Sequence, residues 1–156
     1  MIGIRRANTD DVAAAARCHV ACWREGYAGI LSEDQLVLDL PLRLRMWSSM
    51  VAADSRPWVA TEDDAIIGLA KAGPGRDDDI DLDLELILIY ARQAHWGTGV
   101  GHRLIEAAIG DQSAYLWVFG NNARAIRFYQ RHGFTPDGTE KPHARLGAIE
   151  LRMTRR

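Results

Sequence analysis

Three glycines at alternate positions, Gly97, Gly99 and Gly101, form the segment of this chain with the clearest chemical meaning. Glycine lets the backbone pass close to a ligand and direct successive N–H groups towards one point. The apolar run before these glycines is typical of a strand, and the residues from Val100 onward are typical of a helix. Because a helix start adds N–H donors and the positive end of a dipole, this glycine turn predicts a site for a phosphate or pyrophosphate.

The spacing of the glycine turn separates it from two common phosphate-binding motifs. A Rossmann fingerprint, G-x-G-x-x-G, would place its third glycine where this chain has His102. A Walker A loop beginning at Gly97 would need a glycine there, followed by a lysine, and neither is present. An Mg²⁺-dependent nucleotide enzyme therefore remains only as an alternative.

Acidic side chains alternate with leucines just before the turn. Asp81, Asp83 and Glu85 share one face of a strand predicted over residues 80–91. The first two lie near the strand start, where water can solvate them, whereas Glu85 precedes an apolar run and is predicted to be partly buried. Burial would raise the pKa of Glu85 towards the range of a general base, but an ion pair with an arginine is an equally good interpretation.

A second cluster lies in the segment NNARAIRFYQRHGF, residues 121–134. Asn122 suits a helix cap, and Ala125 and Tyr129 lie one helical turn apart on a common face. The small alanine leaves room for a thin ligand arm, and the Tyr129 hydroxyl could donate a proton to a leaving group. A core tyrosine is the alternative interpretation.

Several other residue types that could carry chemistry have a simpler explanation. His19 and Trp23 share a helix face with Tyr27 following, which is typical either of core or of a pocket for an organic substrate. The only two cysteines, Cys18 and Cys22, are predicted to be small buried hydrophobes. We expect no metal site, because the cysteines lack further ligands nearby.

The elements that must position these residues alternate between strand and helix patterns along one domain, residues 1–156. Strands are predicted at residues 2–6, 57–61, 65–72, 80–91, 115–119, 134–136 and 148–153. Helices are predicted at residues 9–25, 32–38, 41–53, 100–110 and 122–132, the first capped by Thr9. Trp117 falls on an inner strand and is predicted to be core. This order predicts an α/β fold with a mixed sheet.

Composition excludes several classes of protein. The chain has 156 residues and a net charge of −2, so it lacks the broad basic surface of a nucleic-acid binder. No run of 18 apolar residues is present, which predicts no membrane contact, and the N-terminus lacks a signal-peptide core. We therefore expect a cytoplasmic protein.

Taken in order, the motifs resemble those of the GNAT superfamily of acyl-CoA-dependent N-acyltransferases. The segments ELILIYARQAHWGTGVGHRLIEAAI and WVFGNNARAIRFYQRHGF are similar to the two central family motifs, and IRRANTDDVAAAARCHVACWREGY is similar to the family's N-terminal segment. The resemblance covers nearly the whole chain. It implies a central mixed, mostly antiparallel twisted sheet, splayed between its fourth and fifth strands and flanked by helices.

The resemblance also implies an activity, which is direct acetyl transfer from acetyl-CoA to a primary amine of a small molecule or peptide. Glu85 would act as the base, directly or through water, and Tyr129 would protonate the departing thiolate. The acceptor would meet Glu85, Trp23, Tyr27 and Trp117, with Trp47 and Trp58 adding aromatic surface. A homodimer is compatible with the family.

Acetyl-CoA binding is implied for two further groups of residues. The pyrophosphate would meet the glycine turn, and the pantetheine arm would meet strand backbone and the later helix. The implied residues are Ile89, Tyr90, Ala91, Trp96, Gly97, Thr98, Gly99, Val100, Gly101, His102, Asn122, Ala125 and Phe128. Trp96 departs from the arginine or glutamine that is frequent in the family, which leaves Arg103 or Arg124 to supply charge. A module that holds acyl-CoA without catalysis is the alternative function.

Overall fold

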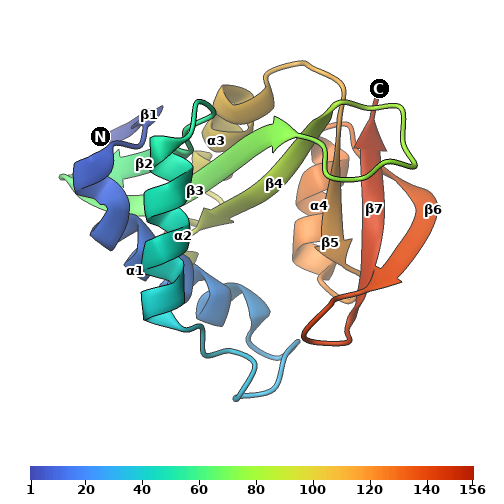
Figure 1. Cartoon of the computed structure of the whole chain (residues 1–156), viewed down its shortest axis with the longest axis horizontal. Coiled ribbons are helices and arrows are strands. Elements are labelled where there is room, and N and C mark those ends of the chain that lie inside the picture. Colours follow the sequence, from blue (N-terminus) through green and yellow to red (C-terminus); the bar gives the residue numbers. More distant parts are fainter. The chain divides into compact units, whose positions relative to one another are not determined.

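The computed structural model describes all 156 residues and groups them into two compact units. The first unit comprises residues 1–72 and 88–110, and the second comprises residues 73–87 and 111–156. Seven strands follow the order β1-β2-β3-β4-β5-β7-β6, with helices on the flanks (Figure 1). β4 and β5 pair in parallel, whereas β1–β2, β2–β3, β5–β7 and β6–β7 are antiparallel. The predicted mixed α/β fold is confirmed.

In the first unit, β1 (Ile2–Arg6) pairs with β2 (Trp58–Glu62), and β2 forms a hairpin with β3 (Ala65–Pro74). The hairpin turn consists of Asp63 and Asp64, both with positive φ, at 49° and 65°. Aspartate tolerates this conformation, and positive φ at both central residues matches the twist of paired strands. The two aspartates between the strands therefore suit the hairpin turn that they form.

Helices cover both faces of the first unit's strands (Figure 1). α1 (Val12–Tyr27) and α2 (Leu40–Ala52) bury Ala15, Trp47 and Val51 together with Val59 and Leu69. On the other face, α3 (Val100–Ile109) packs through its Val100 and Leu104 side chains against a cluster that includes Ala60, Ile67 and Ala70. The alternation of strand residues between two apolar faces explains why both are covered.

The second unit contains the first half of β4 (Leu84–Ala91), followed by β5 (Ala114–Phe119), α4 (Ala123–Arg131), β6 (Thr135–Pro142) and β7 (Ile149–Arg155). β5 pairs with β7 over six positions, whereas β4 and β5 are paired at one position, Glu85 opposite Tyr115. Asn122 caps α4 by accepting a hydrogen bond from the Ala125 amide, as predicted.

Several predicted elements need correction. Residues 32–38 do not form a helix, because the segment closes only one turn, in which the Leu36 amide donates to the Ser32 carbonyl. A single turn gains too few hydrogen bonds to offset helix nucleation. β4 begins at Leu84, so Asp81 and Asp83 lie in the loop before the strand. Asn8, not Thr9, is the first cap, and it precedes a short 3₁₀ turn, Thr9–Asp11. The predicted last two strands extend to Pro142 and Arg155.

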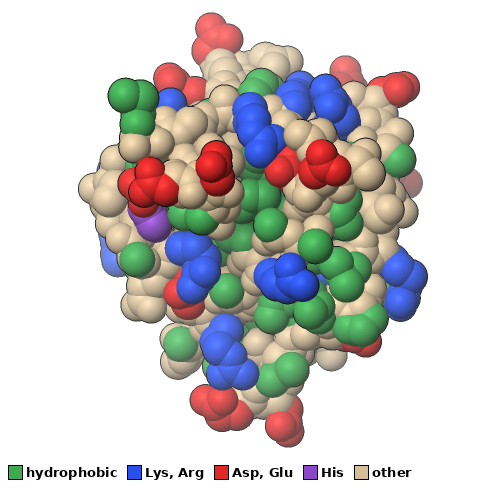
Figure 2. Space-filling view, turned by 90° about the vertical axis from the view of Figure 1, so that its left-hand side faces the viewer, with side chains coloured by type: hydrophobic (Ala, Val, Ile, Leu, Met, Phe, Trp, Pro, Cys, Tyr) green, Lys and Arg blue, Asp and Glu red, His purple; other side chains and the backbone are tan.

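The surface carries charges of both signs. On the face shown in Figure 2, basic and acidic side chains are interspersed, with apolar patches between them. None of the helices has the length and apolar character needed to cross a membrane.

Candidate active site

The glycine turn of the first unit has the conformation that its sequence predicts. A 3₁₀ turn, Gln93–His95, follows β4, and α3 begins directly after Gly99. Gly97 and Gly99 have φ of 76° and 91°, a region that side chains other than glycine rarely adopt. No atom lies within 4 Å of a Cβ placed at either position, so backbone conformation and not crowding requires glycine. No side chain caps α3, which leaves its N-terminus suited to an anion.

Trp96 stabilises the entrance of this turn. Its indole Nε1 donates to the Ala91 carbonyl oxygen at 3.0 Å, joining the turn to the end of β4. The Thr98 hydroxyl donates to the His95 carbonyl at 2.6 Å. Trp96, the residue that departs from the family pattern, therefore contacts the backbone of Ala91, which is itself predicted to bind the cofactor.

In the second unit, Glu85 is the centre of a buried hydrogen-bond network. Its side chain is 1% exposed and forms a bidentate pair with Arg76, with Nε–Oε1 and Nη2–Oε2 distances of 3.0 and 2.6 Å. The backbone amide of Arg76 also donates to Oε1, at 3.1 Å. The Tyr115 hydroxyl donates to the same oxygen at 3.3 Å and accepts from the Asp77 amide at 2.9 Å.

This network overturns the expected rise in the pKa of Glu85. Burial alone would raise it, but the hydrogen bonds and positive charge of Arg76, with the Tyr115 hydroxyl, outweigh burial and hold the pKa of Glu85 below its usual value. Burial and the nearby carboxylate raise the pKa of Tyr115. A carboxylate with a lowered pKa and a bidentate partner is a weak base, so the arginine ion pair is the interpretation that the structure supports.

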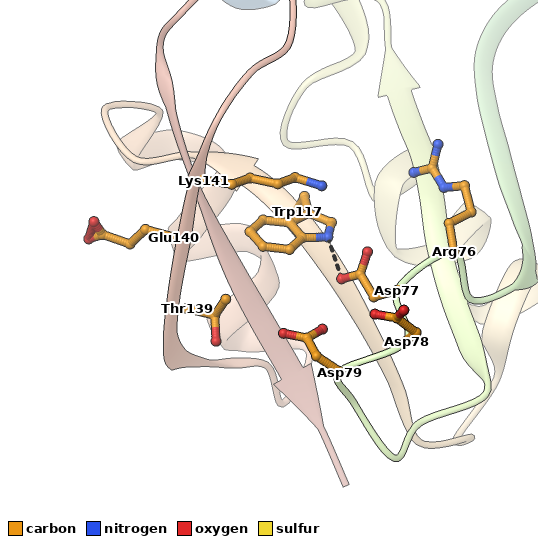
Figure 3. A pocket seen from close by; sticks show the side chains of 8 residues that line it. All are labelled: Arg76, Asp77, Asp78, Asp79, Trp117, Thr139, Glu140 and Lys141. Atoms are coloured by element: carbon orange, nitrogen blue, oxygen red, sulfur yellow. Dashed lines mark hydrogen bonds between the residues drawn. The ribbon is translucent and has the colours of Figure 1, made fainter.

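An open pocket of about 410 Å³ lies beside this network, within the second unit. It is lined by residues 76–79 of the loop before β4, by Trp117 of β5 and by residues 139–141 of β6 (Figure 3). Trp117 is half-buried, its Nε1 donates to Asp77 at 2.9 Å, and the Lys141 ammonium lies 3.9 Å from the centre of its ring. Trp117 is therefore a pocket wall as well as a packed residue.

Arg152 of β7 forms ion pairs with the acidic loop, residues 77–79, that lines this pocket. Its side chain is 6% exposed and donates to Asp137 at 2.6 Å, to Asp79 at 2.7 Å and to Asp77 at 3.3 Å. Its Nη2 also donates to the Thr139 hydroxyl at 3.0 Å. One buried guanidinium thus ties the loop before β4 to β6.

α4 and its cap carry the residues that were predicted to contact acetyl-CoA or protonate its thiolate. Asn122 is buried and its side-chain oxygen is occupied by the helix cap. Ala125, Phe128 and Tyr129 are half-buried, and the Tyr129 ring lies 6.1 Å from that of Phe134, centre to centre. This leaves part of each side chain accessible to a ligand.

The first unit holds the other aromatic candidates. Trp23 is buried, donates to the Gln35 carbonyl at 2.9 Å and packs edge-on against Tyr27. Trp47 is fully buried and donates to Nδ1 of His19 at 3.2 Å, so both are core, and the expectation that Trp47 adds aromatic surface to a pocket is wrong. Burial, with the charge of Arg43, lowers the pKa of His19 to about 4. Trp58 is half-buried beneath the guanidinium of Arg6.

The structure thus brings together two of the residues predicted to meet the acceptor, Glu85 and Trp117. Arg76 links them, because it pairs with Glu85 and lines the same pocket as Trp117. Trp23, Tyr27 and the glycine turn belong to the first unit. Sequence reasoning missed Arg76, Lys141 and Arg152. The segment GRDDD, which places an arginine among acidic residues just before the strand of Glu85, is the one signal in the sequence for Arg76.

Comparison with known proteins agrees with this arrangement of elements. Residues 53–136, more than half of the chain, match the model of the acetyltransferase (GNAT) domain family. The chain is 27% identical over 165 residues to YuaI of Bacillus subtilis, described as an uncharacterised N-acetyltransferase, covering 97% of this chain and 90% of the relative.

Two solved structures share the fold. The PaiA N-acetyltransferase of Thermoplasma acidophilum, solved with coenzyme A, has a TM-score of 0.72 and 17% identity, with 100% of this chain and 99% of the other covered. YncA of Salmonella typhimurium, a putative acetyltransferase solved with acetyl-CoA, has a TM-score of 0.69 and 21% identity, with 99% and 92% covered. With the glycine turn, α4 and the sheet order in place, the family match shows that this chain belongs to the GNAT acetyltransferase family.

Proposed function

We propose that this GNAT chain transfers an acetyl group from acetyl-CoA directly to a primary amine. The observation that carries the proposal is the left-handed glycine turn, which leads into α3 without a side-chain cap. Backbone N–H groups at such a helix start fit a pyrophosphate. Residues 97–102 would hold that group, and bound acetyl-CoA would supply the thioester that the amine attacks.

The amine must lose a proton before it can attack, because an ammonium group has no lone pair. Glu85 is ion-paired and its pKa is lowered, so we do not propose Glu85 as the base that accepts the proton of the amine. We propose instead that the acceptor enters as the free base, which makes kcat/KM rise with pH in step with the unprotonated fraction of the amine. Tyr129 is our candidate donor to the departing thiolate.

A panel of primary amines, with release of free CoA thiol as the signal, tests the proposed function. We expect acetyl-CoA to bind and at least one amine to release thiol and become acetylated, as confirmed by mass spectrometry. Binding of acetyl-CoA without thiol release from any amine would favour the module that holds acyl-CoA without catalysis. Mg²⁺-dependent nucleotide binding would favour the nucleotide enzyme.

Changing Gly99 to alanine is expected to weaken acetyl-CoA binding about tenfold, the cost of misaligning a charge-assisted hydrogen bond. The φ of 91° at Gly99 also makes alanine unfavourable by about 1 kcal/mol in the free energy of unfolding. Gly29→Ala is the matched control, because Gly29 has a φ of 81° and equally open surroundings outside the turn. Calorimetric titration should show weaker binding for Gly99→Ala alone, and equal affinities would contradict a role for the turn.

A further inference from the structure

Arg76 presents two different edges of its guanidinium group. The edge formed by Nε and Nη2 is occupied by Glu85, at 3.0 and 2.6 Å. Nη1, on the other edge, has no hydrogen-bond partner within the protein, and the side chain is 63% exposed. A guanidinium group can bind a carboxylate through each of two edges, so the outer edge of Arg76 is available to a ligand.

Arg76 is held in this orientation by contacts that are difficult to break. Glu85 is 1% exposed, and removing its partner would leave a buried carboxylate without compensating charge. The loop itself is fixed at both sides of Arg76, since the Gly75 amide donates to the Asp83 carbonyl and the Asp77 amide donates to Tyr115. An incoming ammonium group would have to displace the Arg76 guanidinium to reach Glu85, whereas an anion could bind Arg76 as it stands.

The pocket offers charges of both signs beside Arg76. Lys141 reaches over the Trp117 ring with its ammonium end directed towards the side on which Arg76 lies (Figure 3). Lys141 has no carboxylate partner, and the two exposed carboxylates of the pocket lining, Asp78 and Glu140, have no cationic partner. Arg76 and Lys141 could therefore bind an anionic group of a ligand, while Asp78 could accept a hydrogen bond from the uncharged amine of the same ligand.

We infer that Arg76 is a specificity residue that binds a carboxylate of the acceptor, and that Glu85 is a positioning residue that holds Arg76 in place. The acceptor would then be an amine that also carries a carboxylate, such as an amino acid, with Lys141 as a second cation beside the carboxylate. This inference rests on the proposed acetyltransferase function.

Matched pairs of acceptors test the inference. Phenylalanine with phenethylamine, methionine with 3-methylthiopropylamine, and lysine with cadaverine differ by the carboxylate and by the lower amine pKa that it causes, so kcat/KM is compared per unprotonated amine. We expect kcat/KM to be about 10- to 100-fold higher for the carboxylated member of at least one pair, the range for charge-assisted hydrogen bonds. No turnover of any amine would overturn the proposed function, whereas turnover without preference for a carboxylate would overturn this inference alone.

Variants of Arg76 and Glu85 separate recognition from catalysis. R76K keeps the positive charge beside Glu85 but loses the second edge of the guanidinium group. KM for the carboxylated acceptor should therefore rise about tenfold, while KM for the decarboxylated partner is unaffected.

E85Q should raise KM for the carboxylated acceptor, with kcat and the shape of its pH profile unchanged. Loss of the acidic limb of that profile would instead identify Glu85 as a base. R156M, which removes an exposed arginine paired with Asp81, is the control expected to change neither constant. Equal effects of R76K on both members of a pair would overturn the inference.

Discussion

Replacing Arg152 with methionine is expected to lower the free energy of unfolding by about 3 kcal/mol or more, the usual cost of removing one partner from a buried ion pair. Arg152 is 6% exposed, and its two least exposed partners, Asp77 and Asp137, are 15% and 20% exposed. Without the guanidinium group both carboxylates lose their counter-charge. Methionine retains much of the apolar stem, so the loss measures the charge and its hydrogen bonds.

Urea denaturation at pH 7 would measure this loss, and Arg156→Met is its matched control. Arg156 also pairs with an aspartate in the second unit, but both side chains are more than half exposed, so we expect a much smaller change, because solvent screens a surface ion pair. Adding Asp137→Asn to the Arg152 variant should recover part of the stability. A loss for Arg152→Met no greater than that of the control would contradict the role assigned to this network.

The pH dependence of the same variant provides an independent check. Burial raises the pKa of Asp137, but the Thr139 amide and Arg152 together hold it below its usual value. A carboxyl group with a lowered pKa contributes its stability above the unfolded pKa of about 3.9 and loses it as pH falls through the folded value. The difference between the wild type and Arg152→Met should therefore be full above about pH 5 and should shrink below about pH 4.

Local signals in the sequence were the most reliable predictors of the site. Glycine permits the positive φ found at Gly97 and Gly99, and the turn between β2 and β3 is formed by two aspartates flanked by strand residues. The cap at Asn122 is similarly local, because its partner, the Ala125 amide, is three residues away. Each of these features depends on contacts within a few residues, which is why sequence patterns could predict them.

Contacts between distant segments were not predictable in the same way. The apolar run after Glu85 correctly indicated that this side chain is buried, but its partner Arg76 comes from the preceding loop and reverses the expected direction of its pKa shift. The partners of Arg152 lie between 13 and 75 residues away in the sequence, and no pattern linked them. The helix predicted at residues 32–38 is absent for a local reason, because so short a segment cannot offset the cost of helix nucleation.

Changing Tyr129 to phenylalanine is expected to reduce kcat by about 100-fold, the lower end of the range for a general acid. The thiolate of CoA leaves as the tetrahedral intermediate collapses, and a positioned hydroxyl lowers the barrier by supplying a proton at that moment. The attacking nitrogen loses one proton to solvent, and solvent returns a proton to the tyrosine hydroxyl. Phenylalanine keeps the ring that contacts Phe128 and Phe134, so the helix and its packing should be preserved. Steady-state kinetics with saturating acetyl-CoA and the best amine of the panel would measure the change.

The separation of kcat from KM decides what Tyr129 does. A proton donor acts in the transition state, so kcat should fall while the affinity for acetyl-CoA, measured by calorimetry, stays within about threefold. If KM rises and kcat is unchanged, the hydroxyl only binds a substrate and another group protonates the thiolate. If Arg76→Lys, assayed in parallel, changes KM but not kcat, then recognition of the acceptor and protonation of the leaving group belong to different residues, since Arg76 contacts no part of α4 among its hydrogen bonds and ion pairs.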